Sequence, residues 1–194
     1  MISSLKGFAV RHPRILKGIN ILIGLVLCVG AHVTVLVFSG NFHAVVDGEA
    51  YRSAQPSPAA LKKMIKRYSL KSVINLRGRR SDKEWYQKEV AAASESHIQH
   101  IDFKMASSEE LSPEQVTELI RIMRDAPKPV LIHCDHGINR SGLASALYLA
   151  AIKKGSERDS ELQLSPMYGY WPLLFLPTYA MFDSWENAES RFGF

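Results

Sequence analysis

Residues 130–142 read VLIHCDHGINRSG, and this stretch decides the fold that we predict. The apolar run before Cys134 is typical of a buried strand, and a helix rich in Ala and Leu begins at about Ser141. Between them lies a short loop with Gly137 at its centre. A buried strand that passes through a short loop into a helix is typical of an α/β sheet covered by helices.

The loop has the composition of an anion-binding site. Successive backbone N–H groups in such a turn point inward, and the following helix adds the positive end of its dipole. Arg140 supplies a planar guanidinium that matches two oxygens of a phosphate. Cys134 lies at the floor of this positive loop, which favours its thiolate. Because a thiolate below a bound phosphate can attack phosphorus in line, the pattern indicates nucleophilic catalysis.

Strands and helices alternate on both sides of this stretch, which predicts a central, mostly parallel sheet flanked by helices. Ser57 and Ser112 each precede a proline and mark helix starts, and Gln115 is placed to close a capping box. Asp82 is placed to cap a further helix. We predict strands over 42–46, 50–52, 72–76, 97–103 and 129–133, and helices from 58, over 82–96, over 113–127 and over 141–154.

The motif resembles the signature of the cysteine-based protein tyrosine and dual-specificity phosphatases, since His133, Cys134, Gly137, Arg140 and Ser141 all match at the right spacing. Residues 51–56 (YRSAQP) and 73–77 (VINLR) are similar to the compact bacterial dual-specificity-like phosphatases, some of which are exported tyrosine phosphatases. The similarity covers about residues 42–155. It implies a dual-specificity-phosphatase-like fold.

The resemblance also implies roles for single residues. Cys134 matches the nucleophile that forms a phosphocysteine intermediate, Arg140 the phosphate clamp, and Ser141 the hydroxyl that assists departure of the thiolate. His133 matches the residue that supports the loop from behind. The phosphate is expected on the backbone amides of Asp135, His136, Gly137, Ile138, Asn139 and Arg140. No metal or other cofactor is implied, and the His and Cys residues have no spacing typical of a metal site.

The general acid is less clearly marked, because the family uses an aspartate on a loop after the preceding strand. Asp102 lies 32 residues before Cys134, a separation seen in related enzymes, yet our strand prediction includes it. Aligning from the helix start at Ser112 places Ser107 at the acid position, with Glu109 and Glu110 nearby. Asp102, one of these glutamates, or no dedicated acid therefore remain alternatives, with Asp102 preferred.

The charge is uneven along the chain. No acidic residue precedes Asp47, whereas Lys6, Arg11, Arg14 and Lys17 lie near the N-terminus, and the rest is nearly neutral. The net charge of +5 therefore gives no indication of nucleic-acid binding. Two cysteines exclude a disulfide scaffold.

Residues 19–38 contain no charged side chain and are long enough to cross a bilayer as a helix. The positive-inside rule then predicts a basic cytoplasmic tail over 1–18, a signal anchor over 19–38 and a phosphatase domain over 41–194 on the exported side. In a Gram-negative host this is a single-pass inner-membrane protein that faces the periplasm. A cleaved signal peptide and a buried core helix are the alternatives.

Three functions remain open from the sequence. The first is a protein phosphatase acting on phosphotyrosine, phosphoserine or phosphothreonine. The second is a lipid or small-molecule phosphomonoesterase at the membrane, and the third is a phosphate-binding module without turnover. Arg77, Arg79 and Arg80 are candidates for recruiting an anionic substrate, and Arg52 is either structural or a helper at the site. The apolar segment 167–177 either packs on the core or touches the membrane.

Overall fold

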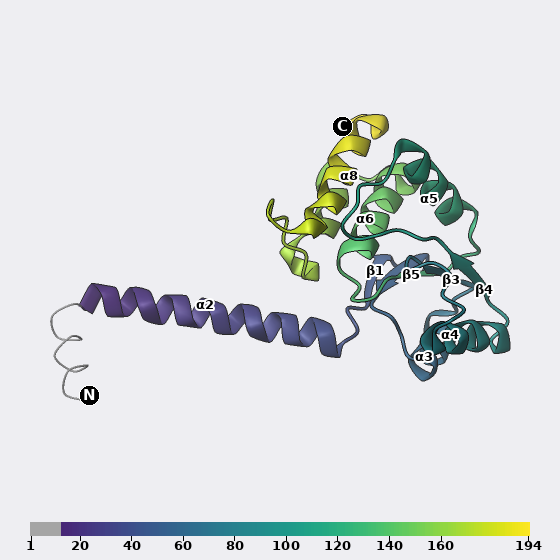
Figure 1. Cartoon of the computed structure of the whole chain (residues 1–194), viewed down its shortest axis with the longest axis horizontal. Helices are drawn as coiled ribbons and strands as arrows, with labels where there is room; N and C mark the ends of the chain where they lie inside the picture. The colour runs from purple at the N-terminus through teal and green to yellow at the C-terminus, as the bar shows by residue number, and fades with distance from the viewer. Residues whose placement is uncertain (1–12) are drawn as a thin grey trace. The chain divides into compact units, whose positions relative to one another are not determined.

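A computed structural model describes residues 13–194 of the chain (Figure 1). The chain divides into two compact units between Phe38 and Ser39. The first unit contains helix α2 (Pro13–Phe38), which begins earlier than the predicted span. Its part from Lys17 to Phe38 is long and apolar enough to cross a membrane, although a signal sequence has the same properties. Two of the four basic residues in the predicted cytoplasmic tail, Lys6 and Arg11, lie outside the described residues.

The second unit is built on a five-stranded sheet with the order β1-β2-β5-β3-β4. Its strands are β1 (His43–Val46), β2 (Ala50–Ser53), β3 (Ser72–Asn75), β4 (Gln99–Asp102) and β5 (Val130–His133). The β1–β2 pair is antiparallel and the other three pairs are parallel. The predicted α/β fold with a mostly parallel sheet is therefore confirmed.

Helices cover both faces of this sheet (Figure 1). One face carries α3 (Pro58–Tyr68) and α4 (Glu84–Glu95). The other carries α5 (Pro113–Asp125), α6 (Asn139–Leu147) and α8 (Ala180–Glu189), together with the π-helix η1 (Tyr148–Lys153). Shorter elements complete the unit: α7 (Glu157–Glu161), η2 (Leu162–Leu164), η3 (Pro166–Tyr168), η4 (Pro177–Tyr179) and η5 (Ser190–Phe192).

Alternation along the strands separates two buried cores. Val73 and Leu131 pack with residues of α3 and α4, whereas their neighbours Ile74 and Ile132 pack into the larger core of the opposite face. Successive side chains of a strand point to opposite faces, so this assignment also fixes the direction of polar residues at the strand ends. His133, two residues after Leu131, lies on the α3–α4 face.

Two of the three helix caps that we predicted from the sequence are present in the structure. Ser57 caps α3 and Ser112 forms a capping box with Gln115 on α5, as predicted. The predicted cap at Asp82 is wrong, because α4 starts one residue later with Lys83 at the N-cap and no side-chain cap. The Asp82 carboxylate instead forms ion pairs with Arg80 and Lys83.

Two predicted boundaries also need correction. The strand predicted over 97–103 is limited to Gln99–Asp102, because His97 takes a left-handed backbone with φ of 54° that ends any extended run. The helix predicted from Ser141 begins at Asn139, since Gly142 N already donates to Ile138 O at 3.0 Å. Its predicted second half is a π-helix.

Candidate active site

Cys134 lies at the carboxyl end of β5, in the centre of the sheet, where the chain turns into α6. It is buried, with only 2% of its surface exposed. Its Sγ atom lies 3.6 Å from the hydroxyl Oγ of Ser141, one turn into the helix. The structure therefore brings together the predicted nucleophile and the predicted hydroxyl.

The carbonyl oxygens of the loop are turned outward and held by donors from other segments. Gln55 N donates to Asp135 O at 3.0 Å, and Asn41 Nδ2 donates to Gly137 O at 2.8 Å. In the part of the chain that the structure describes, the amide N–H groups of residues 135–138 donate no hydrogen bond. These amides are available for an anion above Cys134, as expected for a backbone nest.

Gly137 is required by this geometry for two reasons. Its φ is 69°, in the left-handed region that side chains disfavour. A Cβ atom at this position would also lie 2.4 Å from the backbone N of Ala54. The loop thus packs directly on the backbone that follows β2, and this contact fixes its curvature.

Arg52 binds carbonyl oxygens of the loop through its buried guanidinium. Its Nη2 donates to Gly137 O and Ile138 O, both at 3.0 Å. Its Nη1 donates to the backbone oxygen of Gln163 at 2.8 Å and to the side-chain oxygen of that residue at 3.1 Å. Arg52 is fully buried, and no described carboxylate lies within ion-pair distance. Burial lowers the pKa of Arg52 to about 10, and the nearby Cys134 opposes this shift.

His133 supports the loop through a buried carboxylate that the sequence did not point out. His133 Nε2 lies 3.2 Å from Oε1 of Glu89 on α4, and its Nδ1 lies 3.3 Å from Cys134 O. His100 and Gln55 bind the same carboxylate. Burial by itself raises the pKa of Glu89, but the hydrogen bonds from His100 and His133 outweigh this effect and lower the pKa to about 2.

A weak signal for Glu89 exists in the sequence. The buried residues of α4 are Tyr86, Glu89, Ala92 and Ala93, which form one stripe at helical spacing. A glutamate in an apolar stripe indicates a buried carboxylate with a partner, because an unpaired buried charge is costly. Its partner could not be found in the sequence, since that requires the register of β4 and β5 against α4.

Arg140 occupies the second position of α6, at the mouth of the loop. Its Nε atom is buried and has no hydrogen-bond partner among residues 13–194. Buried donors are almost always paired. An unpaired guanidinium nitrogen beside free backbone amides is the arrangement expected for a phosphate clamp.

Arg77 is the one of the three predicted arginines that reaches the loop. Its Nη1 lies 3.3 Å from the Asp135 carboxylate and donates to Gln55 Oε1 at 3.0 Å. Its guanidinium lies over the ring of Trp85, 3.7 Å from the centroid. Arg77 therefore holds the exposed side of the loop, whereas Arg80 pairs with Asp82.

Asp102, the preferred general acid, ends β4 with its carboxylate in a hydrogen-bonded position. Asn75 Nδ2 donates to its Oδ1 at 2.9 Å, and the Tyr86 hydroxyl donates to its Oδ2 at 2.5 Å. In the sheet register Asn75 pairs with both Asp102 and His133. Two strand spacings, about 10 Å, therefore separate the backbones of Asp102 and His133.

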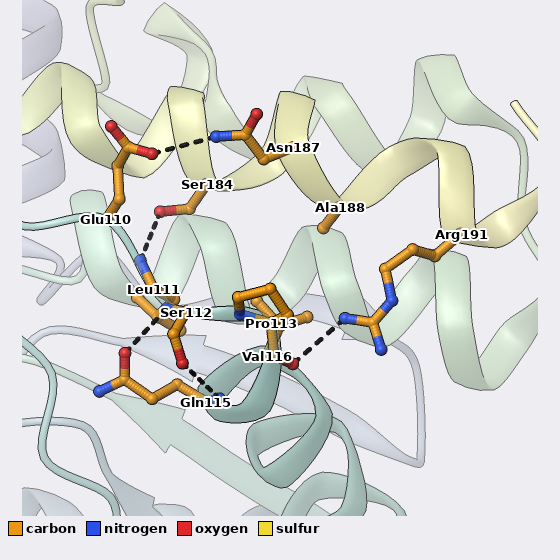
Figure 2. A pocket seen from close by; sticks show the side chains of 10 residues that line it. All are labelled: Glu110, Leu111, Ser112, Pro113, Gln115, Val116, Ser184, Asn187, Ala188 and Arg191. Atoms are coloured by element: carbon orange, nitrogen blue, oxygen red, sulfur yellow. Dashed lines mark hydrogen bonds between the residues drawn. The ribbon is translucent and has the colours of Figure 1, made fainter.

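The alternative acids lie on the loop between β4 and α5. Glu109 and Glu110 are exposed. Figure 2 shows Glu110 beside α8, where its carboxylate accepts from Asn187 Nδ2 at 3.0 Å. It lines a cavity of about 410 Å³ between the start of α5 and α8. Backbone N of the next residue, Leu111, donates to Ser184 Oγ at 3.0 Å, so α8 holds this end of the loop.

No group of three or more potential metal-ligating side chains is present within residues 13–194.

Comparison with protein-family models matches residues 40–170 to the family described as "DSP-PTPase phosphatase fused to NAD+ Kinase". Among curated proteins, no sequence matches the chain at a significant level.

Solved structures share the fold. Tk-PTP in its active form aligns with a TM-score of 0.60 and 18% identity, covering 78% of this chain and 97% of that chain. TpbA of P. aeruginosa aligns with a TM-score of 0.58 and 18% identity, covering 80% and 92%, and a variant of TpbA is known in complex with pTyr. The core catalytic domain of the PP-IP phosphatase SIW14 of S. cerevisiae aligns with a TM-score of 0.57 and 20% identity, covering 78% and 91%.

Proposed function

The chain belongs to the family of DSP-PTPase phosphatases fused to NAD+ kinase, and on that premise we propose that Cys134 is the nucleophile of its phosphatase reaction. The enzyme is a cysteine-based phosphatase of the tyrosine or dual-specificity class. The observation that carries the proposal is the position of the Cys134 thiol, below free loop amides and near the buried cation Arg52.

In the first step the Cys134 thiolate attacks phosphorus, so that an S–P bond forms and the P–O bond of the ester breaks. The amides of residues 135–140 and the Arg140 guanidinium bind the phosphoryl oxygens. They stabilise the transition state more than the ground state when their geometry fits the three equatorial oxygens of a phosphoryl group with the attacking and leaving atoms in line. The leaving oxygen takes a proton from the general acid.

In the second step water attacks the phosphocysteine, and the S–P bond breaks to give inorganic phosphate and the thiolate. Ser141 Oγ lies 3.6 Å from Sγ and can donate to the thiolate as it leaves. The same acid, now a base, accepts the proton of the attacking water. Asp102 remains the first candidate for this role, with Glu109 and Glu110 as alternatives.

The substrate that we propose is a phosphorylated tyrosine, serine or threonine on a protein. The variable loop positions Asp135, His136, Ile138 and Asn139 supply no lysine for a highly charged headgroup. Asp135 adds a negative charge beside the phosphate site and pairs with Arg77, which further disfavours a polyanionic ligand.

We also propose that α2 anchors the enzyme in the inner membrane as a single-pass helix, with residues 41–194 on the periplasmic side. The span from Lys17 to Phe38 supports an anchor by length and composition. Arg14 and Lys17 precede the uncharged residues 19–38, whereas residues 39–51 after them contain no Lys or Arg, and this asymmetry supports the orientation by the positive-inside rule.

Hydrolysis of p-nitrophenyl phosphate and of a phosphotyrosyl peptide by the full chain in detergent, with EDTA present, tests the phosphatase proposal. Rapid quenching with ³²P-labelled substrate should trap one covalent phosphate per chain. Cys134→Ser should lose both turnover and label, by at least about four orders of magnitude in rate. Cys28→Ser is the matched control, because Cys28 lies in α2, and it should keep both. Label that persists in Cys134→Ser contradicts the assigned nucleophile.

A further inference from the structure

Residues 171–176, which we call the apolar loop, read WPLLFL and leave their side chains outside the core. Leu174 and Phe175 are 81% and 80% exposed, and Trp171 is 41% exposed. Exposed apolar residues are common singly, but contiguous apolar patches on a protein surface mark interaction sites. The sequence left open whether this segment packs on the core or touches a membrane.

The apolar loop is held in its exposed conformation from both ends. Tyr170, just before it, is buried, and its hydroxyl donates to Thr178 O at 3.0 Å, just after it. Inside the loop Leu173 N donates to Trp171 O at 2.8 Å, and Leu176 N donates to Leu173 O at 2.9 Å. The Tyr170 side chain thus links the two ends of the apolar loop, and the apolar side chains between them are exposed.

The chain segment that follows α2 contacts the segment just before the apolar loop. Phe38 ends the apolar helix, and three residues later Asn41 is buried, with its Nδ2 donating to Tyr168 O at 3.0 Å. The ring of His43 also packs on the ring of Tyr168, with 4.9 Å between centroids. Asn41, which holds the segment that leads into the apolar loop, is therefore separated from the last residue of the apolar helix by at most about 11 Å of chain.

From these observations we propose that the apolar loop inserts into the interface of the same bilayer that holds α2. This inference rests on the membrane anchor proposed above. The residue types fit, since tryptophan is enriched at membrane interfaces and Leu and Phe form the buried face of interfacial segments. Two contacts, the helix and the loop, restrict how the enzyme can turn on the membrane surface.

This contact also places the active site near the membrane. Nδ2 of Asn41, which holds Tyr168, donates in addition to Gly137 O of the phosphate loop at 2.8 Å. One buried side chain, three residues after the end of α2 in the chain, therefore connects the segment before the apolar loop with the phosphate loop. The phosphoryl groups that this enzyme reaches are those held close to the bilayer surface.

Fluorescence quenching by lipid tests the proposal with the full chain. The protein is reconstituted into phosphatidylcholine–phosphatidylglycerol vesicles with or without bromine on the acyl chains. Trp85 and Trp185 also emit, so the signal of Trp171 is taken as the difference between the natural protein and Trp171→Phe. We expect brominated lipid to quench this difference signal at least about twofold. An equal difference signal in both lipids would overturn the proposal.

A double variant separates insertion from folding. Leu174→Ser with Phe175→Ser should at least halve the quenching of Trp171 and leave turnover of p-nitrophenyl phosphate in detergent unchanged. Leu162→Ser, at a residue 38% exposed outside the apolar loop, is the matched control and should keep full quenching. Equal quenching in the double variant overturns the proposal, and so does chemical cross-linking that shows the loop buried against a second copy.

Vesicle flotation distinguishes this inference from the proposals on which it rests. A chain that floats with vesicles but shows no Trp171 quenching keeps its anchor and refutes only the loop contact. A chain that does not float refutes the anchor and the loop contact together. Activity in detergent is independent of both results, so the phosphatase proposal stands or fails by itself.

Discussion

Two loops at the carboxyl edge of the same sheet differ in how they are held. The loop between β5 and α6, residues 134–138, has its carbonyl oxygens bound by Asn41, Arg52 and Gln55, which come from distant parts of the chain. The loop between β4 and α5 is tied mainly near its ends, by the bridge between Arg77 and Lys104 and by the bond from Leu111 to Ser184.

This difference indicates which catalytic groups must be fixed in position before the substrate binds. A group of amides stabilises a transition state only when the amides already point at the charge that develops, so the phosphate loop is fixed from every side. A proton donor needs only to come within hydrogen-bond reach of the leaving oxygen when substrate is bound. The β4–α5 loop can therefore carry exposed carboxylates without such support.

Asp102→Asn is the substitution with the largest expected effect in this comparison. If the carboxylate at the end of β4 is the proton donor, kcat falls about 10²–10⁴-fold and the pH profile loses its basic limb. The pH dependence of p-nitrophenyl phosphate hydrolysis measures this. The matched variants are Glu109→Gln and Glu110→Gln. An unchanged profile in Asp102→Asn with loss of the limb in either glutamate variant moves the acid to the β4–α5 loop.

Arg140→Lys tests the clamp in the phosphate loop. Lysine keeps the charge but loses the planar fork that binds two phosphoryl oxygens, so kcat is expected to fall about 10²–10³-fold. Steady-state kinetics on p-nitrophenyl phosphate give the value. Arg158→Lys, in α7, is the control and should be unchanged. A large rise in KM with unchanged kcat would mean that Arg140 binds the ground state and the transition state equally.

Arg52→Met tests the support beneath the phosphate loop. Methionine fills much of the same volume but leaves the carbonyl groups of Gly137 and Ile138 without their shared donor. Each carbonyl then keeps a single donor, Asn41 Nδ2 for Gly137 O and Gly142 N for Ile138 O. The loop is held less firmly, and we expect a fall in kcat of about 10- to 100-fold with a lower Tm. A loss of Tm with unchanged kcat in the folded variant would assign Arg52 to stability alone. Kinetics and thermal unfolding measured on one preparation separate the two outcomes.

Glu89→Gln acts on stability more than on rate. The pKa of Glu89 is lowered to about 2 from 4.5, so this group stabilises the fold above about pH 4.5 and loses this contribution as the pH falls toward 2. The variant should lose about 3 kcal/mol at neutral pH, because His133 and His100 then lack an anionic partner. The free energy of unfolding of the variant should also no longer show the decrease between about pH 4.5 and pH 2 that is due to Glu89. Denaturant unfolding between pH 2 and 7 measures both effects.

Glu95→Gln is the control for this prediction, since Glu95 is an exposed residue of the same helix, paired with Lys62. Its stability should change by less than about 1 kcal/mol. An equal acid dependence in Glu89→Gln and in the natural protein would contradict the assignment of Glu89.

The phosphate loop could be predicted from the sequence because its signals are local. A strand is followed by a glycine and an arginine within a few residues, and the amides of a nest come from successive residues of the chain. The Ser-Pro helix starts at Ser57 and Ser112 were predicted for the same reason. The predicted cap at Asp82 was wrong, although the motif is local, because its carboxylate pairs with Arg80 and Lys83 instead.

Local patterns in the sequence were enough to predict the alternation of strands and helices, the apolar helix near the N-terminus and the arrangement from Cys134 to Ser141. Only the tertiary structure decided that Arg52 clamps this loop and that Glu89 holds His133. It also decided that the apolar loop faces outward. The contacts of Arg52 and Glu89 depend on the register between elements 40 or more residues apart, which strand pairing and helix packing set together and no local pattern encodes.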